Sequence, residues 1–199
     1  MARPIAKDHD DKRRRILSSA AVVFASEGFD RASVAKVALA CDVSKATLYH
    51  YYSSKDDILF DILDSYLSEL KDQVCEMDIE WKSPREAFQL TVREILLAYQ
   101  GSDNEHRLQT GGLGHLSDEK QSILRGHQID LVRHMDGLLH AVAPEIFDED
   151  PPKLRATTMS VYGMLNWFYM WKPDAGEAAR EDYANLVCQL TLDGVTGLQ

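Results

Sequence analysis

The sequence has few cysteines and no long apolar segment. Its three cysteines, Cys41, Cys75 and Cys188, stand far apart and none belongs to a C-x-x-C pair, which excludes a disulfide framework and is typical of a reducing compartment. No apolar run approaches the ~20 residues that a membrane-spanning helix needs. Residues 12–15 are basic and precede an apolar stretch, as in a signal peptide, but acidic residues come before them and the stretch has helical spacing. The sequence therefore predicts a cytoplasmic protein.

Basic residues are in the minority. The 199 residues include 22 lysines and arginines against 32 aspartates and glutamates, a formal net charge of −10. Such a total disfavours nucleic-acid binding, because a protein that neutralises phosphates is usually basic. However, residues 1–55, the head, hold 10 basic and 6 acidic side chains, whereas residues 56–199, the body, hold 12 and 26. This basic head on an acidic body keeps nucleic acid among the candidate partners.

Apolar residues recur at helical spacing along the whole chain, and no segment shows the alternation of a β-strand. Capping and breaking residues mark the ends of helices, such as Ser83-Pro84 before one helix and Gly28 after another. The sequence predicts an all-α fold of about nine helices, at residues 10–27, 33–41, 44–52, 54–75, 84–100, 102–114, 117–143, 152–172 and 177–195. We expect a helix-turn-helix domain over residues 1–55 and a ligand-binding and dimerisation domain over 56–199, which starts with a connecting helix at about 54–75.

Residues 34–53 have the spacing of a helix-turn-helix. The apolar positions of that motif are filled by Val37, Ala38, Cys41, Val43, Leu48 and Tyr51. Asp42 occupies the turn position that most often holds glycine, and aspartate is among the few other residues that tolerate positive φ. Two short helices with a tight turn also occur in purely structural settings, but the basic head favours DNA binding.

The second helix of such a motif enters the major groove, where its first residues meet the base edges. Lys45 can donate to guanine, and Ala46 and the Thr47 methyl group suit the methyl group of thymine. Tyr49 and His50 offer donors to phosphate oxygens, and a lysine at the next helix start adds a cation. The predicted DNA-binding residues are Ser33, Ser44, Lys45, Ala46, Thr47, Tyr49, His50 and Lys55.

The stretch VSKATLYHYYSSKDDIL, residues 43–59, closely resembles the signature of TetR-family transcriptional regulators. Residues 24–29 and 33–38 resemble the first two helices of the same family, although Asp42 and Ala46 stand where the family commonly has glycine. The resemblance covers about residues 10–65 and implies a homodimeric repressor, not an enzyme, that binds a palindromic operator and is released by a small molecule. One recognition helix reads too few bases for a genome, which also favours a two-fold repeated site.

Residues 154–171 are apolar nearly all round, so this helix must be covered on two sides. Other helices of the same chain could cover both sides, in the core of a monomer. An interface in which the last two helices pair with the same helices of a second chain satisfies this requirement too, and the family resemblance favours this homodimer.

Residues 166–174, NWFYMWKPD, resemble the body of TetR-type regulators of fatty-acid and aromatic-acid catabolism, whose effectors are often acyl-CoA thioesters. The resemblance implies a small hydrophobic effector, such as an acyl-CoA thioester, as a second partner besides DNA. Apolar residues of the body could line a tunnel for it, with arginines near an anionic head group. The predicted ligand-binding residues are Leu96, Tyr99, Arg107, Leu108, Arg133, Met135, Tyr162 and Asn166.

Other sites are weaker candidates. His127, Asp130 and His134 lie at i, i+3 and i+7, on one face of a predicted helix, and could bind a metal or simply face solvent. Cys41 lies beside the recognition helix, but a buried cysteine is usually inert to oxidation. We expect no catalytic set and no cofactor. The alternatives to a repressor are a helical ligand-binding or protein-interaction module without DNA binding, and a regulator that senses metal or redox state.

Overall fold

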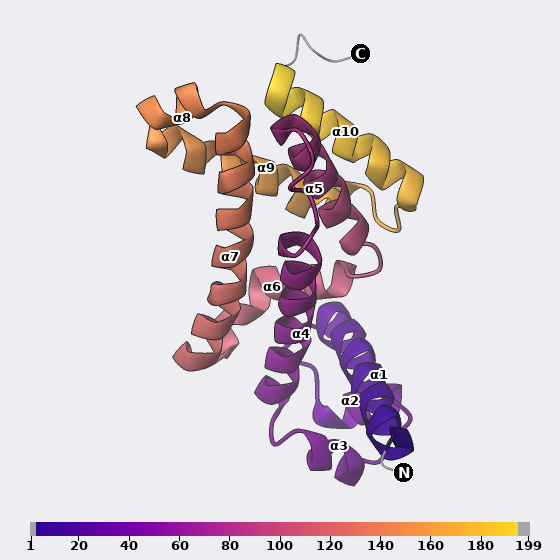
Figure 1. Cartoon of the computed structure of the whole chain (residues 1–199). Helices are drawn as coiled ribbons and strands as arrows, with labels where there is room; N and C mark the ends of the chain where they lie inside the picture. Colours follow the sequence, from indigo (N-terminus) through magenta and orange to yellow (C-terminus); the bar gives the residue numbers. More distant parts are fainter. Residues whose placement is uncertain (1–2, 195–199) are drawn as a thin grey trace. The chain divides into compact units, whose positions relative to one another are not determined.

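Helix-capping residues place most helix starts where the sequence predicts them. Ser83 opens α5 with a full capping box to Glu86, and Ser33 and Ser44 cap the two short helices of the head. The computed structural model describes residues 3–194, with side chains from Asp11 onward, and every element in that range is helical (Figure 1). The α-helices are α1 (Arg3–Glu27), α2 (Val34–Ala40), α3 (Lys45–Tyr51), α4 (Lys55–Cys75), α5 (Pro84–Ala98), α6 (Asp103–Gly112), α7 (Asp118–Val142), α8 (Pro144–Glu149), α9 (Pro151–Trp171) and α10 (Glu177–Asp193), and Leu113–His115 form a 3₁₀-helix, η1.

Several helices differ from the prediction in their boundaries. Helix α1 begins at Arg3 rather than at an aspartate cap, and Pro4 falls in its first turn, where proline is tolerated. The short helix α8 begins at Pro144, in a segment where the sequence predicts no helix, because a proline that ends one helix is also well placed to start the next. Helix α10 ends before Gly194, which adopts a φ of 71°. The predicted end at Val195 lies outside the described residues.

The first of two compact units combines the chain up to Tyr66 with Asn104–Leu124. Its core includes an apolar face of α1, on which Ile16, Ala20 and Phe24 are buried. Phe29 follows α1 and lies 5.2 Å from Phe24 and 4.7 Å from His115, measured between ring centroids. The segment from α6 to the start of α7 therefore packs with the helix-turn-helix in this unit.

The second unit combines Leu67–Asp103 with the chain from Arg125 onward. Helix α5 packs against α10 and α9 (Figure 1). The buried face of α9 presents Val161, Leu165 and Phe168 to this core, and another face exposes Met159, Trp167 and Met170. Helix α9, which is apolar nearly all round, thus has only one of its apolar sides covered within the second unit.

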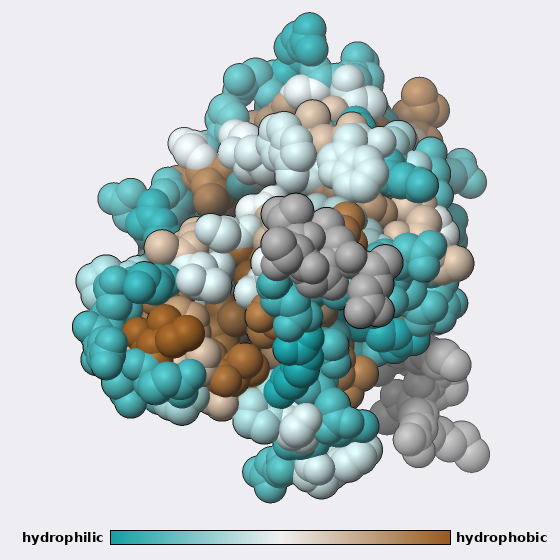
Figure 2. All heavy atoms as spheres, turned by 90° about the horizontal axis from the view of Figure 1, so that it is seen from above, coloured by the Kyte–Doolittle hydropathy of each residue, from teal (hydrophilic) through white to brown (hydrophobic). Residues whose placement is uncertain are grey.

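Hydrophilic side chains cover most of the face drawn in Figure 2, and hydrophobic ones gather there in small patches. Within residues 3–194, no helix combines the length and the apolar character needed to cross a membrane. Helix α9 exposes Met159, Trp167 and Met170, and exposed apolar patches of this kind usually mark a binding surface.

Candidate nucleic-acid interface

The turn between α2 and α3 has the backbone that the sequence predicts. Asp42 adopts a φ of 54°, in the left-handed region, and the amide of Val43 donates to the carbonyl of Ala38 at 3.0 Å. Aspartate tolerates this conformation at a small energetic penalty, which glycine would not incur. The helix-turn-helix geometry therefore forms without the usual glycine.

Two of the predicted DNA-binding serines cap helices. Ser33 Oγ accepts from the amide of Lys36 at 3.3 Å, and Ser44 Oγ accepts from the amide of Thr47 at 3.0 Å. The hydroxyls of Ser44 and Thr47 also lie 2.8 Å apart and share a hydrogen bond. These contacts fix the first turn of α3, the part of a recognition helix that meets the bases.

Helix α3 presents one polar face outward. Lys45, Ala46, Tyr49 and His50 are exposed, at positions i, i+1, i+4 and i+5 of the helix. The Tyr49 side chain is 55% exposed, which is high for a large aromatic residue. The opposite side holds Leu48, which is fully buried. The structure thus brings four of the predicted residues together on one surface, where each can reach a ligand.

Lys55, for which the sequence predicts a phosphate contact, is engaged inside the protein instead. Its ammonium group donates to the carbonyl of Phe29 at 2.6 Å and to those of Asp30 and Ala32 at 3.3 Å. The same group lies 4.3 Å from the centre of the Phe29 ring. Because an ammonium has three hydrogens, these carbonyls use all of its donors. The structure therefore gives Lys55 the role of holding the turn after α1 against α4, and it does not support the phosphate contact.

Sequence reasoning missed a charged network behind the recognition helix. Arg13 Nε donates to Asp61 Oδ2 at 2.9 Å, and the Tyr52 hydroxyl donates to the same carboxylate. Burial and this hydrogen bond raise the pKa of Tyr52, so the phenol stays protonated. The network fastens the C-cap of α3 to α1 and α4. Its members lie 9 and 48 residues apart in the chain, so no spacing rule links them.

Half of the predicted ligand-binding set lies buried in the second unit. Leu96, Tyr99, Met135 and Tyr162 are at most 7% exposed. The Tyr99 hydroxyl donates to Asn166 Oδ1 at 2.7 Å, and the Tyr162 hydroxyl donates to a backbone carbonyl of α7 at 2.9 Å. Burial raises the pKa of both phenols, which keeps them neutral. Helices α5, α7 and α9 thus surround an apolar interior that contains a few polar groups.

The remaining members of that set lie elsewhere, and one of them, Asn166, is an exposed residue of α9 although it accepts the hydrogen bond from Tyr99. Arg107 and Leu108 belong to the first unit, on α6. The Arg133 side chain is 73% exposed and lies 3.9 Å from Asp130, one turn away on the same helix. The structure therefore does not place Arg133 in the interior, because a guanidinium on this face of α7 remains hydrated.

The weak candidates for metal and redox sensing find no support. Among the residues whose side chains are described, no group of three metal-binding side chains is assembled, His127, Asp130 and His134 included. Cys41 is buried, and burial raises the pKa of its thiol. Oxidation proceeds through the thiolate, so a raised pKa makes this thiol less reactive.

Two family models match the chain. The model described as "Bacterial regulatory proteins, tetR family" covers residues 16–62. The model described as "Tetracyclin repressor-like, C-terminal domain" covers residues 82–195. The first match contains the helix-turn-helix, and the second contains all of the helices from α5 to α10.

Solved structures and curated proteins give the same result. A TetR-family transcriptional regulator from Bordetella parapertussis 12822 is 28% identical, with a TM-score of 0.86 over 94% of this chain and 97% of that chain. AibR, solved in complex with isovaleryl coenzyme A and operator DNA, is 23% identical and shares the fold, with a TM-score of 0.75 over 91% and 98%. The curated "Uncharacterized HTH-type transcriptional regulator YuxN" of Bacillus subtilis is 28% identical over 132 residues, which are 65% of this chain and 45% of that protein. The matched segments span less than half the length of each curated relative.

Proposed function

Because the chain belongs to the TetR family of bacterial regulatory proteins, we propose that it is a ligand-responsive transcriptional repressor that binds a palindromic operator as a homodimer. The exposed face of α3 carries this proposal: Lys45, Ala46, Tyr49 and His50 face outward from a helix whose other side is buried. In this arrangement Lys45 donates to a guanine in the major groove, and Tyr49 and His50 contact the backbone phosphates beside it.

We expect Lys45→Ala to weaken binding to the preferred DNA sequence about tenfold and to reduce the preference over unrelated DNA, because a lysine–guanine contact supplies ~1–3 kcal/mol of discrimination. The preferred sequence can be selected from a random library with the wild-type protein. Fluorescence anisotropy at several salt concentrations then measures the affinities of both proteins for selected and unrelated DNA.

Lys55→Met is the matched control, since it also removes one cation from the head. Its ammonium bonds to carbonyl groups, so we expect lower thermal stability with unchanged specificity and salt dependence. Equal losses of specificity in the two variants would contradict the role of Lys45. A wild-type protein that selects no DNA would instead favour a helical ligand-binding module.

The dimer that we propose forms through α9 and α10. An apolar stripe runs along the outer face of α9, and its members are at least half exposed: Met159, Trp167, Met170 and Trp171. Leu186 extends the apolar surface on α10 and is 38% exposed. Exposed apolar patches of this kind usually mark an interface, and obligate interfaces resemble a core cut in half. Two copies that pair these helices would cover the second side of α9 and place two recognition helices on one operator.

We further propose that the effector is a small hydrophobic molecule of the acyl-CoA thioester class. The support comes from the interior between α5, α7 and α9, where the hydroxyls of Tyr99 and Tyr162 stand among apolar residues such as Leu96 and Met135. An interior of this composition, mostly apolar with a few placed polar groups, suits an acyl chain joined to a thioester. AibR, which shares the fold, binds isovaleryl coenzyme A.

A thermal-shift series with acyl-CoA thioesters of increasing chain length tests this effector class. At 100 times its Kd, a bound thioester stabilises the protein by ~2.7 kcal/mol, which for this chain length corresponds to a Tm increase of roughly 5–10 °C. The same thioester should release the bound DNA. Free coenzyme A measures the Tm increase due to the head group alone, and fatty acids of equal chain length measure the increase due to the chain alone. If no thioester raises the Tm while DNA binding remains intact, the effector belongs to another class.

A further inference from the structure

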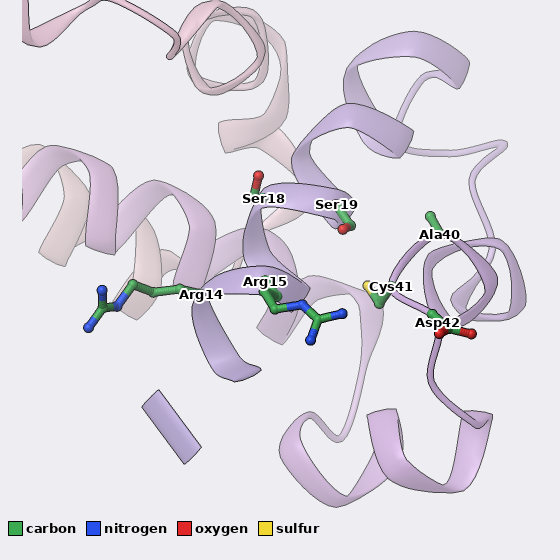
Figure 3. Close-up of a pocket in the computed structure, with 7 residues that line it drawn as sticks. All are labelled: Arg14, Arg15, Ser18, Ser19, Ala40, Cys41 and Asp42. Carbon is green, nitrogen blue, oxygen red and sulfur yellow. The ribbon is translucent and has the colours of Figure 1, made fainter. Parts of the chain in front are cut away.

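An open pocket lies on the head where α1 passes the end of α2 (Figure 3). Two arginines and two serines of α1 line it together with residues 40–42: Arg14, Arg15, Ser18 and Ser19. Arg15 extends toward Cys41 and Asp42, whereas Arg14 points the other way along the helix. The pocket therefore combines one guanidinium group with neighbouring hydroxyl donors.

Among the cations of the head whose side chains are described, Arg15 differs from the four that bind carboxylate or carbonyl groups of the protein. The engaged cations, each bonded to a carboxylate or a carbonyl group, are Arg13, Arg31, Lys36 and Lys55. Arg14 lies 3.8 Å from Asp11 in an exposed pair. Arg15 has neither an ion pair nor a hydrogen bond to any side chain from Asp11 onward, the range in which side chains are described. A guanidinium in this state suits an external anion.

The pocket adjoins the turn that leads into the recognition helix. Asp42 precedes Lys45, the first residue of α3, by three positions. When the start of a recognition helix enters the major groove, the segment just before it comes close to the phosphates at the edge of the groove. An arginine fork and serine hydroxyls are typical phosphate ligands. Charge and position thus favour the same partner, a DNA backbone phosphate.

We propose that this pocket receives a phosphate of the operator backbone, with Arg15 as the cation and Ser18 and Ser19 as hydroxyl donors. The proposal rests on the proposed DNA binding and extends it, because the contact lies outside the face of α3. Arg15 thereby takes over the phosphate contact that Lys55 does not supply.

Asp42 is the acidic member of the pocket and opposes the bound phosphate. Its carboxylate points away from Arg15 (Figure 3), and its left-handed backbone, with a φ of 54°, restricts the replacements that the turn accepts. Asparagine tolerates the same conformation without the charge. Asp42→Asn therefore isolates the electrostatic effect from the backbone conformation.

The experiment measures DNA affinity against salt concentration for the full chain and its variants, on DNA selected by the wild-type protein. We expect Arg15→Gln to weaken binding about tenfold and to lower the slope of log K against log salt by about 0.9 for each protomer bound. Arg15→Lys should retain the slope, and Asp42→Asn should tighten binding about twofold. Arg133→Gln, which removes an exposed arginine of α7, should leave the slope unchanged.

A second measurement uses DNA in which single phosphates are replaced by neutral methylphosphonates. One position should weaken the wild-type complex but not the Arg15→Gln complex, which identifies the phosphate in the pocket. If Arg15→Gln keeps the wild-type slope, or if every methylphosphonate affects both proteins equally, the pocket holds no phosphate while DNA binding by α3 stands. If the wild-type protein binds no DNA, both the pocket and the proposed function are overturned.

Discussion

Trp167→Glu is expected to produce a monomer at micromolar concentration and to weaken operator binding by at least about 100-fold. Trp167 is 59% exposed at the centre of the apolar stripe of α9. In the proposed dimer it is covered, so a glutamate there would be buried without a partner, and an unpaired buried charge destabilises an interface by ~2–5 kcal/mol. Loss of the dimer also separates the two recognition helices, and half of a palindrome then supplies the binding. Sedimentation velocity and fluorescence anisotropy measure these two effects.

Trp81→Glu is the matched control for this substitution. Trp81 is 70% exposed, between α4 and α5, and its indole nitrogen donates to the carbonyl of Asp78. The same change of residue at this position should leave the dimer and its DNA affinity intact. A wild-type monomer, or a Trp167→Glu variant that still sediments as a dimer, would contradict the interface on α9.

Features set by local rules could be predicted from the sequence. The short polar side chain of Asp42 predicts that this residue accepts positive φ, and the structure confirms this with a φ of 54°. Ser83 and Glu86 form the capping box that their spacing predicts. The face of α3 follows from a period of 3.6 residues, which separates Lys45 and Tyr49 from the buried Leu48. Each of these features depends on residues within one or two helical turns.

Features set by contacts between distant residues could not be predicted. The position of Lys55 at a helix start suggests a free cation, but the ammonium meets the carbonyl of Phe29, 26 residues away in the chain. The pairing of Arg13 with Asp61 spans 48 residues. The grouping of Asn104–Leu124 with the first unit depends in the same way on tertiary packing, such as the contact of Phe29 with His115. Spacing and composition carry no information about such partners.

These long-range contacts change what the charge of the head means. A net charge of +4 over residues 1–55 suggests a diffuse attraction to DNA. Arg13, Lys36 and Lys55 are bound to acidic or carbonyl groups of the protein, whereas Arg15 lies at the pocket beside residues 40–42 and Lys45 is exposed at the start of α3. The head therefore offers a few placed contacts rather than an evenly basic surface, which favours a fixed register on DNA.

Arg180→Met is expected to lower the free energy of unfolding by about 3–5 kcal/mol, or the Tm by roughly 10 °C for a chain of this length. Arg180 is 2% exposed. Its guanidinium donates to the carbonyls of Ala175 at 2.9 Å and Leu96 at 3.2 Å, and it lies 3.8 Å from the Asp103 carboxylate. Methionine would fill the space but leave the two buried carbonyls without their donors and the Asp103 carboxylate, whose side chain is 23% exposed, without its cation. Urea denaturation followed by circular dichroism measures the change.

Arg93→Met provides the comparison, because Arg93 also joins α5 to α10 through an ion pair, with Glu181, but its side chain is 39% exposed. Water can replace the lost partner there, so we expect a change below about 1 kcal/mol. A similar small change in Arg180→Met would mean that burial of the guanidinium offsets its hydrogen bonds. The expected large change would mean that the buried guanidinium holds α5, Asp103 and α10 together within the second unit.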